Sequence, residues 1–287
     1  MDYAIQVKNL TKTYKDFTLD NISLSLPCGT VMGLIGENGA GKSTFINSLL
    51  NVVEAQYDQL HILGHDLKTQ EKLIKQDIAV IFSDSHLDLS FTPLFAGKML
   101  SKMYKNWDQE KYLQLLKRFG LPEKKRLKKL STGMRVKVEF AVALSHSPKL
   151  LILDEASSGL DPVVREEILD ILREFTEDED RAVLISSHIT SDLDKIADYI
   201  AYIHEGKLLF VRTYDELRND FGIITCGRRL FDALNPDDIA AYRKETYNYR
   251  VLVHNRQKIK KTFPDVPVEN ASVEDIMLFY VKGEKTR

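Results

Sequence analysis

The stretch from residue 36 to residue 43 limits the possible folds more than any other part of this chain. It reads Gly-Glu-Asn-Gly-Ala-Gly-Lys-Ser and follows the apolar run 31–35, which predicts a short buried strand. The glycines let backbone N–H groups turn inward around a phosphate, where a Cβ atom would clash. A helix beginning near Lys42 would add its positive end. The pattern therefore predicts a strand, a phosphate-binding loop and a helix.

The residue types in this loop indicate a nucleoside triphosphate as the ligand. Lys42 is placed to reach the β- and γ-phosphates, and the Ser43 hydroxyl is placed to bind Mg²⁺. A dinucleotide-binding loop has no role for this Lys-Ser pair, and a flexible glycine turn would show the full pattern in about one chain in a hundred. We expect the nucleotide to be contacted by Gly36, Glu37, Asn38, Gly39, Ala40, Gly41, Lys42, Ser43 and Thr44.

Apolar runs elsewhere predict an alternation of strands and helices. This alternation is typical of an α/β fold with a mainly parallel sheet covered on both faces. Alternating apolar residues near Ile5 and Ile22 predict short strands and a β-rich start of the chain. Further buried strands are expected at 78–82, 150–153 and 182–185, with a helix from 164 to 175 between the last two.

Two regions depart from this alternation. Apolar stripes at helical spacing over 112–119 and 134–142 predict a helical insertion that covers about 87–145. In the C-terminal part, an expected strand at 249–253 and an expected helix capped by Ser272 predict a small α+β extension. We therefore expect a catalytic domain over 1–218 and an extension over 219–287.

The expected strand at 150–153 ends in two carboxylates, Asp154 and Glu155. The carboxyl ends of parallel strands meet at one edge of a sheet, so these side chains should lie beside the phosphate loop. Asp154 could then hold Mg²⁺ through a water, and Glu155 could deprotonate the attacking water. His188 follows another expected strand and could reach a γ-phosphate oxygen. Alone, such residues are common at strand ends, but the phosphate loop favours catalytic roles.

Three further motifs make this chain resemble the ABC ATPases. Residues 130–134 resemble the signature loop of that family, and residues 158–161 resemble its D-loop. Tyr14 matches the aromatic residue that stacks on adenine. These motifs stand in the family's order from about residue 8 to residue 210. The resemblance implies a P-loop NTPase core with a β-rich N-terminal subdomain and a helical insertion, which binds ATP and Mg²⁺ and hydrolyses ATP.

The resemblance also implies a second ATPase subunit. In the family, two subunits associate head to tail, and each signature loop covers the ATP bound to the other. Ser131 and Gly133 stand at the head of an expected helix, whose free N–H groups and positive end suit a phosphate. We therefore expect these two residues to contact nucleotide across a dimer with an identical or a related chain.

Two segments depart from the family's pattern. Thr132 and Met134 stand where the signature often has glycine and glutamine, but Ser131 and Gly133 are retained, so activity is expected. After the strand at 78–82 the family usually places a glutamine, and here stand Ser83 and Asp84. Asp84 could approach Mg²⁺ or the attacking water. The apolar residues that follow, Leu87, Leu89, Phe91, Leu94 and Phe95, are expected to receive a membrane partner.

The composition and the absence of certain segments limit the partners. Forty basic residues oppose forty-two acidic ones, so no nucleic-acid partner is expected. Neither a signal peptide nor a run of about 18 apolar residues occurs, which favours the cytosol. The cysteines Cys28 and Cys226 lie far apart and are not expected to form a disulfide.

Three functions fit a chain with this phosphate loop: the ATPase subunit of a membrane transporter, a nucleotide kinase or GTPase, and a soluble ABC ATPase acting on nucleic acid or the ribosome. Nucleotide kinases and GTPases are excluded because they do not use a signature loop. The soluble ABC ATPase is the alternative to the transporter subunit. In DNA-repair members a long coiled coil precedes the signature, whereas fewer than 90 residues separate Lys42 from Ser131, and ribosome-acting members generally carry two ATPase units. The resemblance to bacterial ABC-2-type exporters implies a separate integral membrane subunit, a place at the cytoplasmic face of the cell membrane, and export of peptides, toxins or antibiotics. Import is the open alternative for the direction of transport.

Overall fold

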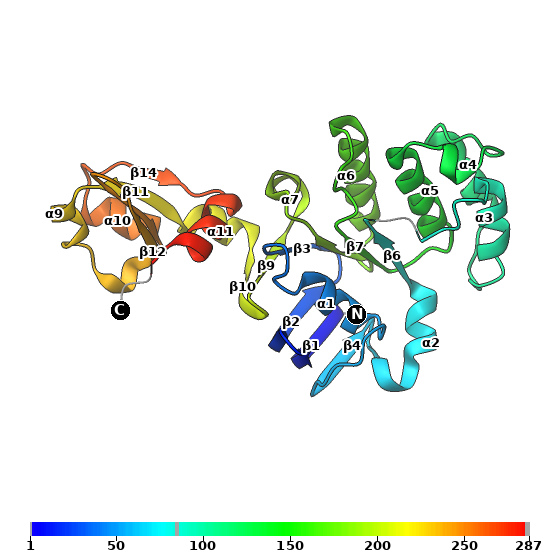
Figure 1. Cartoon of the computed structure of the whole chain (residues 1–287), viewed down its shortest axis with the longest axis horizontal. Helices are drawn as coiled ribbons and strands as arrows, with labels where there is room; N and C mark the ends of the chain where they lie inside the picture. The colour runs from blue at the N-terminus through cyan, green and yellow to red at the C-terminus, as the bar shows by residue number, and fades with distance from the viewer. Residues whose placement is uncertain (1, 84–85, 285–287) are drawn as a thin grey trace. The chain divides into compact units, whose positions relative to one another are not determined.

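The computed structural model describes residues 2–83 and 86–284. Contacts between Cα atoms divide these residues into two units, one up to Val211 and one from Arg212 onward. Figure 1 labels most of the elements of both units. The sequence pattern predicts this division after residue 218. In the structure, α8 (Tyr214–Asp220) belongs to the second unit, because it contacts α10 (Arg256–Thr262).

The first unit is built on one sheet of ten strands among the described residues, in the order β5-β4-β1-β2-β10-β9-β3-β8-β7-β6. The neighbours β9, β3, β8, β7 and β6 are parallel, which confirms the predicted parallel centre. The strands are β1 (Tyr3–Thr13), β2 (Thr18–Pro27), β3 (Val31–Ile35), β4 (Gln59–Ile62), β5 (His65–Asp66), β6 (Ile78–Phe82), β7 (Leu150–Asp154), β8 (Ala182–Ser186), β9 (Tyr199–His204) and β10 (Lys207–Thr213).

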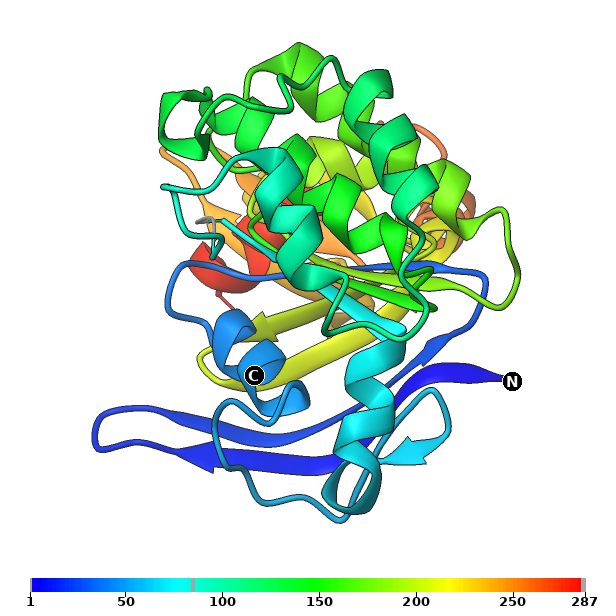
Figure 2. The same ribbon diagram turned by 90° about the vertical axis from the view of Figure 1, so that its right-hand side faces the viewer.

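The two N-terminal strands are longer than the sequence predicted. β1 and β2 form an extended antiparallel hairpin, drawn in blue in Figure 2. The pairing shifts register between Val7 and Leu10, and Asn9 there has a φ of +54°. Such a bulge interrupts the alternation of buried residues, which is why the pattern after Val7 did not predict a continuing strand.

The helices of the first unit follow the predicted pattern. The predicted helix at 164–175 lies within α6, and the two stripes of the insertion form α4 and α5. Together with α3 they lie side by side in Figures 1 and 2, around a separate apolar cluster that includes Tyr112 and Val138. The bounds are α1 (Lys42–Leu49), α2 (Leu67–Asp77), α3 (Pro93–Leu100), α4 (Gln109–Arg118), α5 (Thr132–Ser145), α6 (Pro162–Thr176) and α7 (Thr190–Ile196), with a 3₁₀ turn at Leu127–Lys129.

The main core fixes the helix that carries the phosphate loop. Phe45 and Ile46 of α1 are fully buried and belong to the same apolar cluster as Leu10 of β1 and Leu150 of β7. Burial of a Phe or Ile side chain contributes about 1.5–3 kcal/mol. The first turn of α1 is therefore held in place by packing from both parts of the sheet.

The second unit has its own antiparallel sheet and core. Its strands lie in the order β12-β13-β11-β14, and the cluster beneath them includes Val251 and Ile259. The helix expected to be capped by Ser272 begins with a capping box at that residue, and α8 begins with another at Thr213. The elements after α8 are β11 (Gly222–Cys226), α9 (Arg228–Phe231), a 3₁₀ turn (Pro236–Asp238), β12 (Ile239–Lys244), β13 (Tyr249–Val253), α10, β14 (Val268–Asn270) and α11 (Val273–Lys282).

The cysteines and the helices complete the description of the fold. Cys28 and Cys226 are both free thiols. Within residues 2–83 and 86–284, every helix is too short or too polar to cross a membrane.

Candidate nucleotide-binding and hydrolysis site

The phosphate-binding loop connects β3 to α1, and Lys42 lies inside it. The lysine is 5% exposed. Its Nζ donates hydrogen bonds to the carbonyl oxygens of Gly36 at 2.8 Å and Glu37 at 3.2 Å. The Ala40 N–H also donates to the Glu37 carbonyl oxygen, at 3.1 Å. The ammonium group therefore holds the loop together and stands beside the backbone groups that a bound phosphate would contact.

Two glycines of the loop lie where a side chain would collide with its neighbours. A Cβ atom on Gly36 would lie 2.3 Å from the carbonyl oxygen of Ile203 in β9. Gly41 has a φ of +115°, and a Cβ atom there would lie 2.9 Å from side-chain atoms of Phe17 and Leu19. Residues other than glycine rarely adopt such a conformation. The loop is thus seated against β9 and against the hairpin of β1 and β2.

The two predicted carboxylates lie at the end of β7. Asp154 is 7% exposed, and its Oδ1 accepts a hydrogen bond of 2.6 Å from the hydroxyl of Ser186 in β8. The Glu155 N–H donates to the same hydroxyl oxygen at 3.0 Å. Glu155 itself has a φ of +55°. A glutamate in this sparsely populated region is held by its surroundings, and such strain concentrates at functional sites.

Glu155 connects the phosphate loop to His188. One carboxylate oxygen of Glu155 lies 3.4 Å from the Nζ of Lys42. The other is in hydrogen-bond contact with the Nδ1 of His188. The His188 side chain is 46% exposed, so the ring is accessible to solvent and to a ligand. The structure thus brings together three residues that the sequence assigned to separate steps, from segments far apart along the chain.

A cavity of about 460 Å³ opens above this cluster. Besides loop residues and Glu155, it is lined by Phe17, which the sequence analysis did not select. Phe17 follows Tyr14 by three positions, and the hydrogen bond from the Tyr14 N–H to the Phe17 carbonyl oxygen, 2.7 Å long, closes a turn between them. The sequence signal that could have identified Phe17 is the presence of an aromatic residue in the turn that precedes a phosphate loop. The residues of the loop in this lining are Glu37, Asn38, Gly39, Gly41, Lys42, Ser43 and Thr44.

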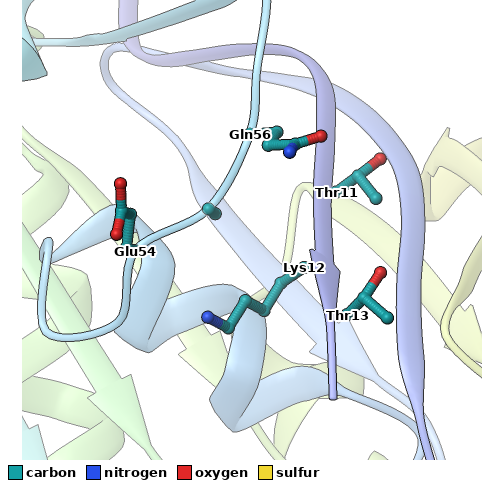
Figure 3. A pocket seen from close by; sticks show the side chains of 6 residues that line it. Thr11, Lys12, Thr13, Glu54 and Gln56 are labelled. Carbon is teal, nitrogen blue, oxygen red and sulfur yellow. The ribbon is translucent and has the colours of Figure 1, made fainter. Parts of the chain in front are cut away.

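Tyr14 is not among the residues that line this cavity. Its side chain is 44% exposed, and the Nζ of Lys12 lies 5.1 Å from its ring centroid, in cation–π geometry. A separate polar pocket of about 350 Å³ lies next to it, between the end of β1 and residues 54–56 (Figure 3). The adenine-stacking role of Tyr14 stays a prediction.

The signature residues lie at the beginning of α5. The Ser131 hydroxyl oxygen caps this helix by accepting a hydrogen bond of 3.2 Å from the Met134 N–H, and Ser131 is exposed. Gly133 is buried, and a Cβ atom there would lie 3.1 Å from a methyl group of Val164 in α6. Neither residue lines the cavity above Lys42. Their role at the nucleotide also stays a prediction.

The remaining predicted residues are placed as follows. Ser43 and Thr44 lie in the first turn of α1, and Ser43 is exposed. Ser83 follows β6 and is exposed, whereas Asp84 lies outside the described residues. Within the described part of the chain, no three His, Cys, Asp or Glu side chains form a group that could hold a metal ion alone.

A buried loop lysine that faces a carboxylate at the end of another parallel strand of the same sheet defines a P-loop nucleoside triphosphatase. The sequence profile of the ABC transporter family matches residues 19–158. The lantibiotic transport ATP-binding protein SrtF of Streptococcus pyogenes is 34% identical over 218 residues, which cover 75% of this chain and 93% of SrtF. This chain therefore belongs to the ABC transporter ATP-binding proteins, as the motifs predicted, and it is an ATPase that binds and hydrolyses ATP.

Other relatives agree with this assignment. The bacitracin transport ATP-binding protein BcrA of Enterococcus faecalis is 32% identical over 73% of this chain and 69% of its own. The daunorubicin/doxorubicin resistance ATP-binding protein DrrA of Streptomyces peucetius is 31% identical over 80% of this chain and 71% of its own. A solved ATP-binding subunit of an ABC transporter superposes with a TM-score of 0.69 at 26% identity, covering 75% of this chain and 92% of that one.

Proposed function

We propose that this chain powers the export of peptide antibiotics, toxins or similar amphipathic compounds through a separate membrane protein. The observation that carries the proposal is the match of its ATPase unit to SrtF, BcrA and DrrA, whose names refer to lantibiotic transport, bacitracin transport and daunorubicin/doxorubicin resistance. We place the chain at the cytoplasmic face of the cell membrane, where ATP is available.

At the phosphate loop, bound ATP would take over the contacts of Lys42. The ammonium that now pairs with Glu155 at 3.4 Å would turn to the β- and γ-phosphates. Glu155 would then be released to accept a proton from the attacking water. His188, which touches Glu155, would hold that carboxylate in place and donate a hydrogen bond toward the γ-phosphate. These roles rest on geometry and on the family's motifs.

The residues present also fit Mg²⁺. Magnesium prefers oxygen ligands, and it usually takes one or two protein groups together with phosphate oxygens and waters. The Asp154 carboxylate is oriented by Ser186, and the Ser43 hydroxyl is exposed beside the loop, so these two would hold the ion. When bound, Mg²⁺ would neutralise the charge that develops on the phosphates.

We further propose that two ATPase subunits complete each other's sites. The Ser131 hydroxyl accepts a bond from the Met134 N–H, so its own proton is free to be donated to a phosphate oxygen. The exposed beginning of α5 adds the positive end of a helix of 14 residues. Because Ser131 does not line the cavity above Lys42 in its own chain, the fitting arrangement is head to tail.

The surface for the membrane subunit is a groove between β6, α3 and α5. It is a cavity of about 250 Å³ that is mainly apolar, and its lining includes Phe82, His86 and Leu100. Its floor holds His146, whose ring stacks on Tyr104 with 3.8 Å between centroids. Burial is the largest cause that lowers the pKa of His146, so this ring is uncharged at neutral pH. A short amphipathic helix would fit such a groove.

Part of the surface predicted from the sequence is only partly exposed. Leu87 and Phe91 pack against the cluster around Tyr112. Leu89 and Phe95 are 40% and 43% exposed, so they remain available to a partner. Met99 and Met103, 41% and 66% exposed, extend the apolar surface along α3 and the residues that follow it.

Cross-linking in membranes tests this proposal. A cysteine at His86 is expected to cross-link to an integral membrane protein, because His86 lines the groove. A cysteine at Asp180 is the control, since it lies in the exposed turn before β8, at the opposite end of the parallel strands. Capture of a ribosomal or other soluble protein from His86, or equal capture from Asp180, would contradict the proposal. Export itself predicts that cells carrying an inactive chain become more sensitive to peptide antibiotics.

A further inference from the structure

An ion pair between an arginine whose side chain is 25% exposed and a buried aspartate joins the two helices that follow Glu155 and His188. Arg165 stands in the first turn of α6, directly after the D-loop at 158–161. Its Nη1 lies 3.6 Å from Oδ1 of Asp192, and its Nη2 donates to the Leu160 carbonyl oxygen at 3.4 Å. Asp192 stands in the first turn of α7, four residues after His188, and is 3% exposed. One guanidinium therefore contacts the D-loop and the helix that follows His188.

The segment that follows β7 and the segment that follows β8 are also joined where they leave the sheet. Asp154 of β7 and Ser186 of β8 are paired in the sheet, so the segments that follow them run beside each other. Glu155 and His188 are in contact just beyond that pair. α6 and α7, which continue the segments, are also in contact (Figure 1). The relative position of Glu155 and His188 thus depends on contacts at both ends of the two segments.

The stability of the fold alone does not explain this ion pair. The Nε of Arg165 and the Oδ2 of Asp192 are buried and have no hydrogen-bond partner among the described residues. Burying charged groups is costly unless they are fully paired, and an apolar pair of similar size is often at least as stable. The planar guanidinium group of an arginine holds its N–H donors in a fixed geometry, so it is well suited to keep two groups at a set separation.

We propose that Arg165 and Asp192 are positioning residues that hold His188 in register with Glu155 for the hydrolysis of ATP. The inference rests on the catalytic roles proposed above for Glu155 and His188. Neither Arg165 nor Asp192 lines the cavity above Lys42, so ATP binding does not depend on them. A misplacement of a catalytic group by about 1 Å can cost on the order of a hundredfold in rate. Loss of the pair therefore acts on kcat and leaves ATP affinity unchanged.

The chain offers a matched control pair. Lys195 of α7 and Glu166 of α6 also form an ion pair between the same two helices. Their side chains are 48% and 47% exposed. Exposed pairs contribute little, because water screens them and two long side chains must be ordered. Removing this pair tests whether any ionic contact between α6 and α7 would have the same effect.

The experiment compares steady-state ATP hydrolysis and ATP binding in the full chain. Asp192→Asn and Arg165→Lys are expected to lower kcat about tenfold or more, with Kd for ATP within about twofold of the wild type. Lys195→Met is expected to match the wild type in both. Thermal unfolding of each variant establishes that it is folded at the assay temperature.

A double variant keeps the inference testable if a single change unfolds the protein. Arg165→Met with Asp192→Leu removes both charges together, which usually preserves stability. We expect this variant to be folded, to bind ATP and to remain slow. Wild-type kcat in the double variant or in the folded single variants, or an equal loss in Lys195→Met, would overturn the inference. Undiminished hydrolysis in Glu155→Gln would instead contradict the catalytic assignment itself.

Discussion

Replacement of Glu155 by glutamine is expected to leave ATP binding intact and to lower kcat by about two to four orders of magnitude, the usual contribution of a general base. The amide keeps the shape of the carboxylate, but it cannot accept the proton of the attacking water. It also removes the negative charge that lies 3.4 Å from the Nζ of Lys42. Because that charge competes with the phosphates for the lysine, the affinity for ATP should be equal to that of the wild type or higher.

The measurement is phosphate release under steady-state conditions together with calorimetric titration of ATP. Glu177→Gln is a suitable control, because Glu177 is exposed at the end of α6, beyond its last helical residue. Glu177→Gln should behave as the wild type in both assays. If Glu155→Gln hydrolyses ATP at the normal rate, the general base is another group.

Replacement of Lys42 by alanine is expected to weaken ATP binding strongly for two reasons. The variant lacks the charge that opposes the phosphates, and it also loses the hydrogen bonds to Gly36 and Glu37 that hold the loop closed. Glu155 would then face the phosphates without a neutralising partner. Charge-assisted hydrogen bonds contribute about 1.5–3 kcal/mol each, so Kd for ATP should rise on the order of a hundredfold or more.

Equilibrium binding of a fluorescent ATP analogue measures this effect, and thermal unfolding checks that Lys42→Ala remains folded. Lys75→Ala provides the control, since Lys75 lies on the surface of α2 and pairs with Glu71. A folded Lys42→Ala variant that binds ATP as tightly as the wild type would show that nucleotide does not bind at this loop.

The local patterns in this sequence predicted the centre of the fold well. The strands at 31–35 and 78–82 have the predicted bounds, because fully buried strands of a parallel sheet form continuous apolar runs. The glycine loop and the capping boxes were equally local, since each depends on residues within about eight positions. The bulge at Asn9 was not predictable, because it is defined by pairing with a partner strand.

The contacts that make the candidate site work are not local. Lys42, Glu155 and His188 come from three segments, and their meeting depends on the strand order β3-β8-β7, which no single segment specifies. Phe17 reaches the cavity because the turn after β1 folds over Gly41. The pair of Arg165 and Asp192 is not predictable for the same reason, since neither residue lies in a recognisable motif. The spacing of residues along the chain predicts which functional side chains are present, whereas the strand order of the sheet determines which of them come into contact.

The most direct test of the proposal that two ATPase subunits complete each other's sites is to mix two inactive variants of this chain. Lys42→Ala disables the phosphate loop and leaves Ser131 intact, whereas Ser131→Arg blocks the signature loop and leaves Lys42 intact. A head-to-tail pair of these two variants contains one site with both groups unchanged. We predict that the mixture hydrolyses ATP faster than the sum of the two variants measured separately, and that Glu155→Gln forms dimers when ATP is added. A mixture no faster than that sum, with Glu155→Gln remaining monomeric in ATP, would contradict the account.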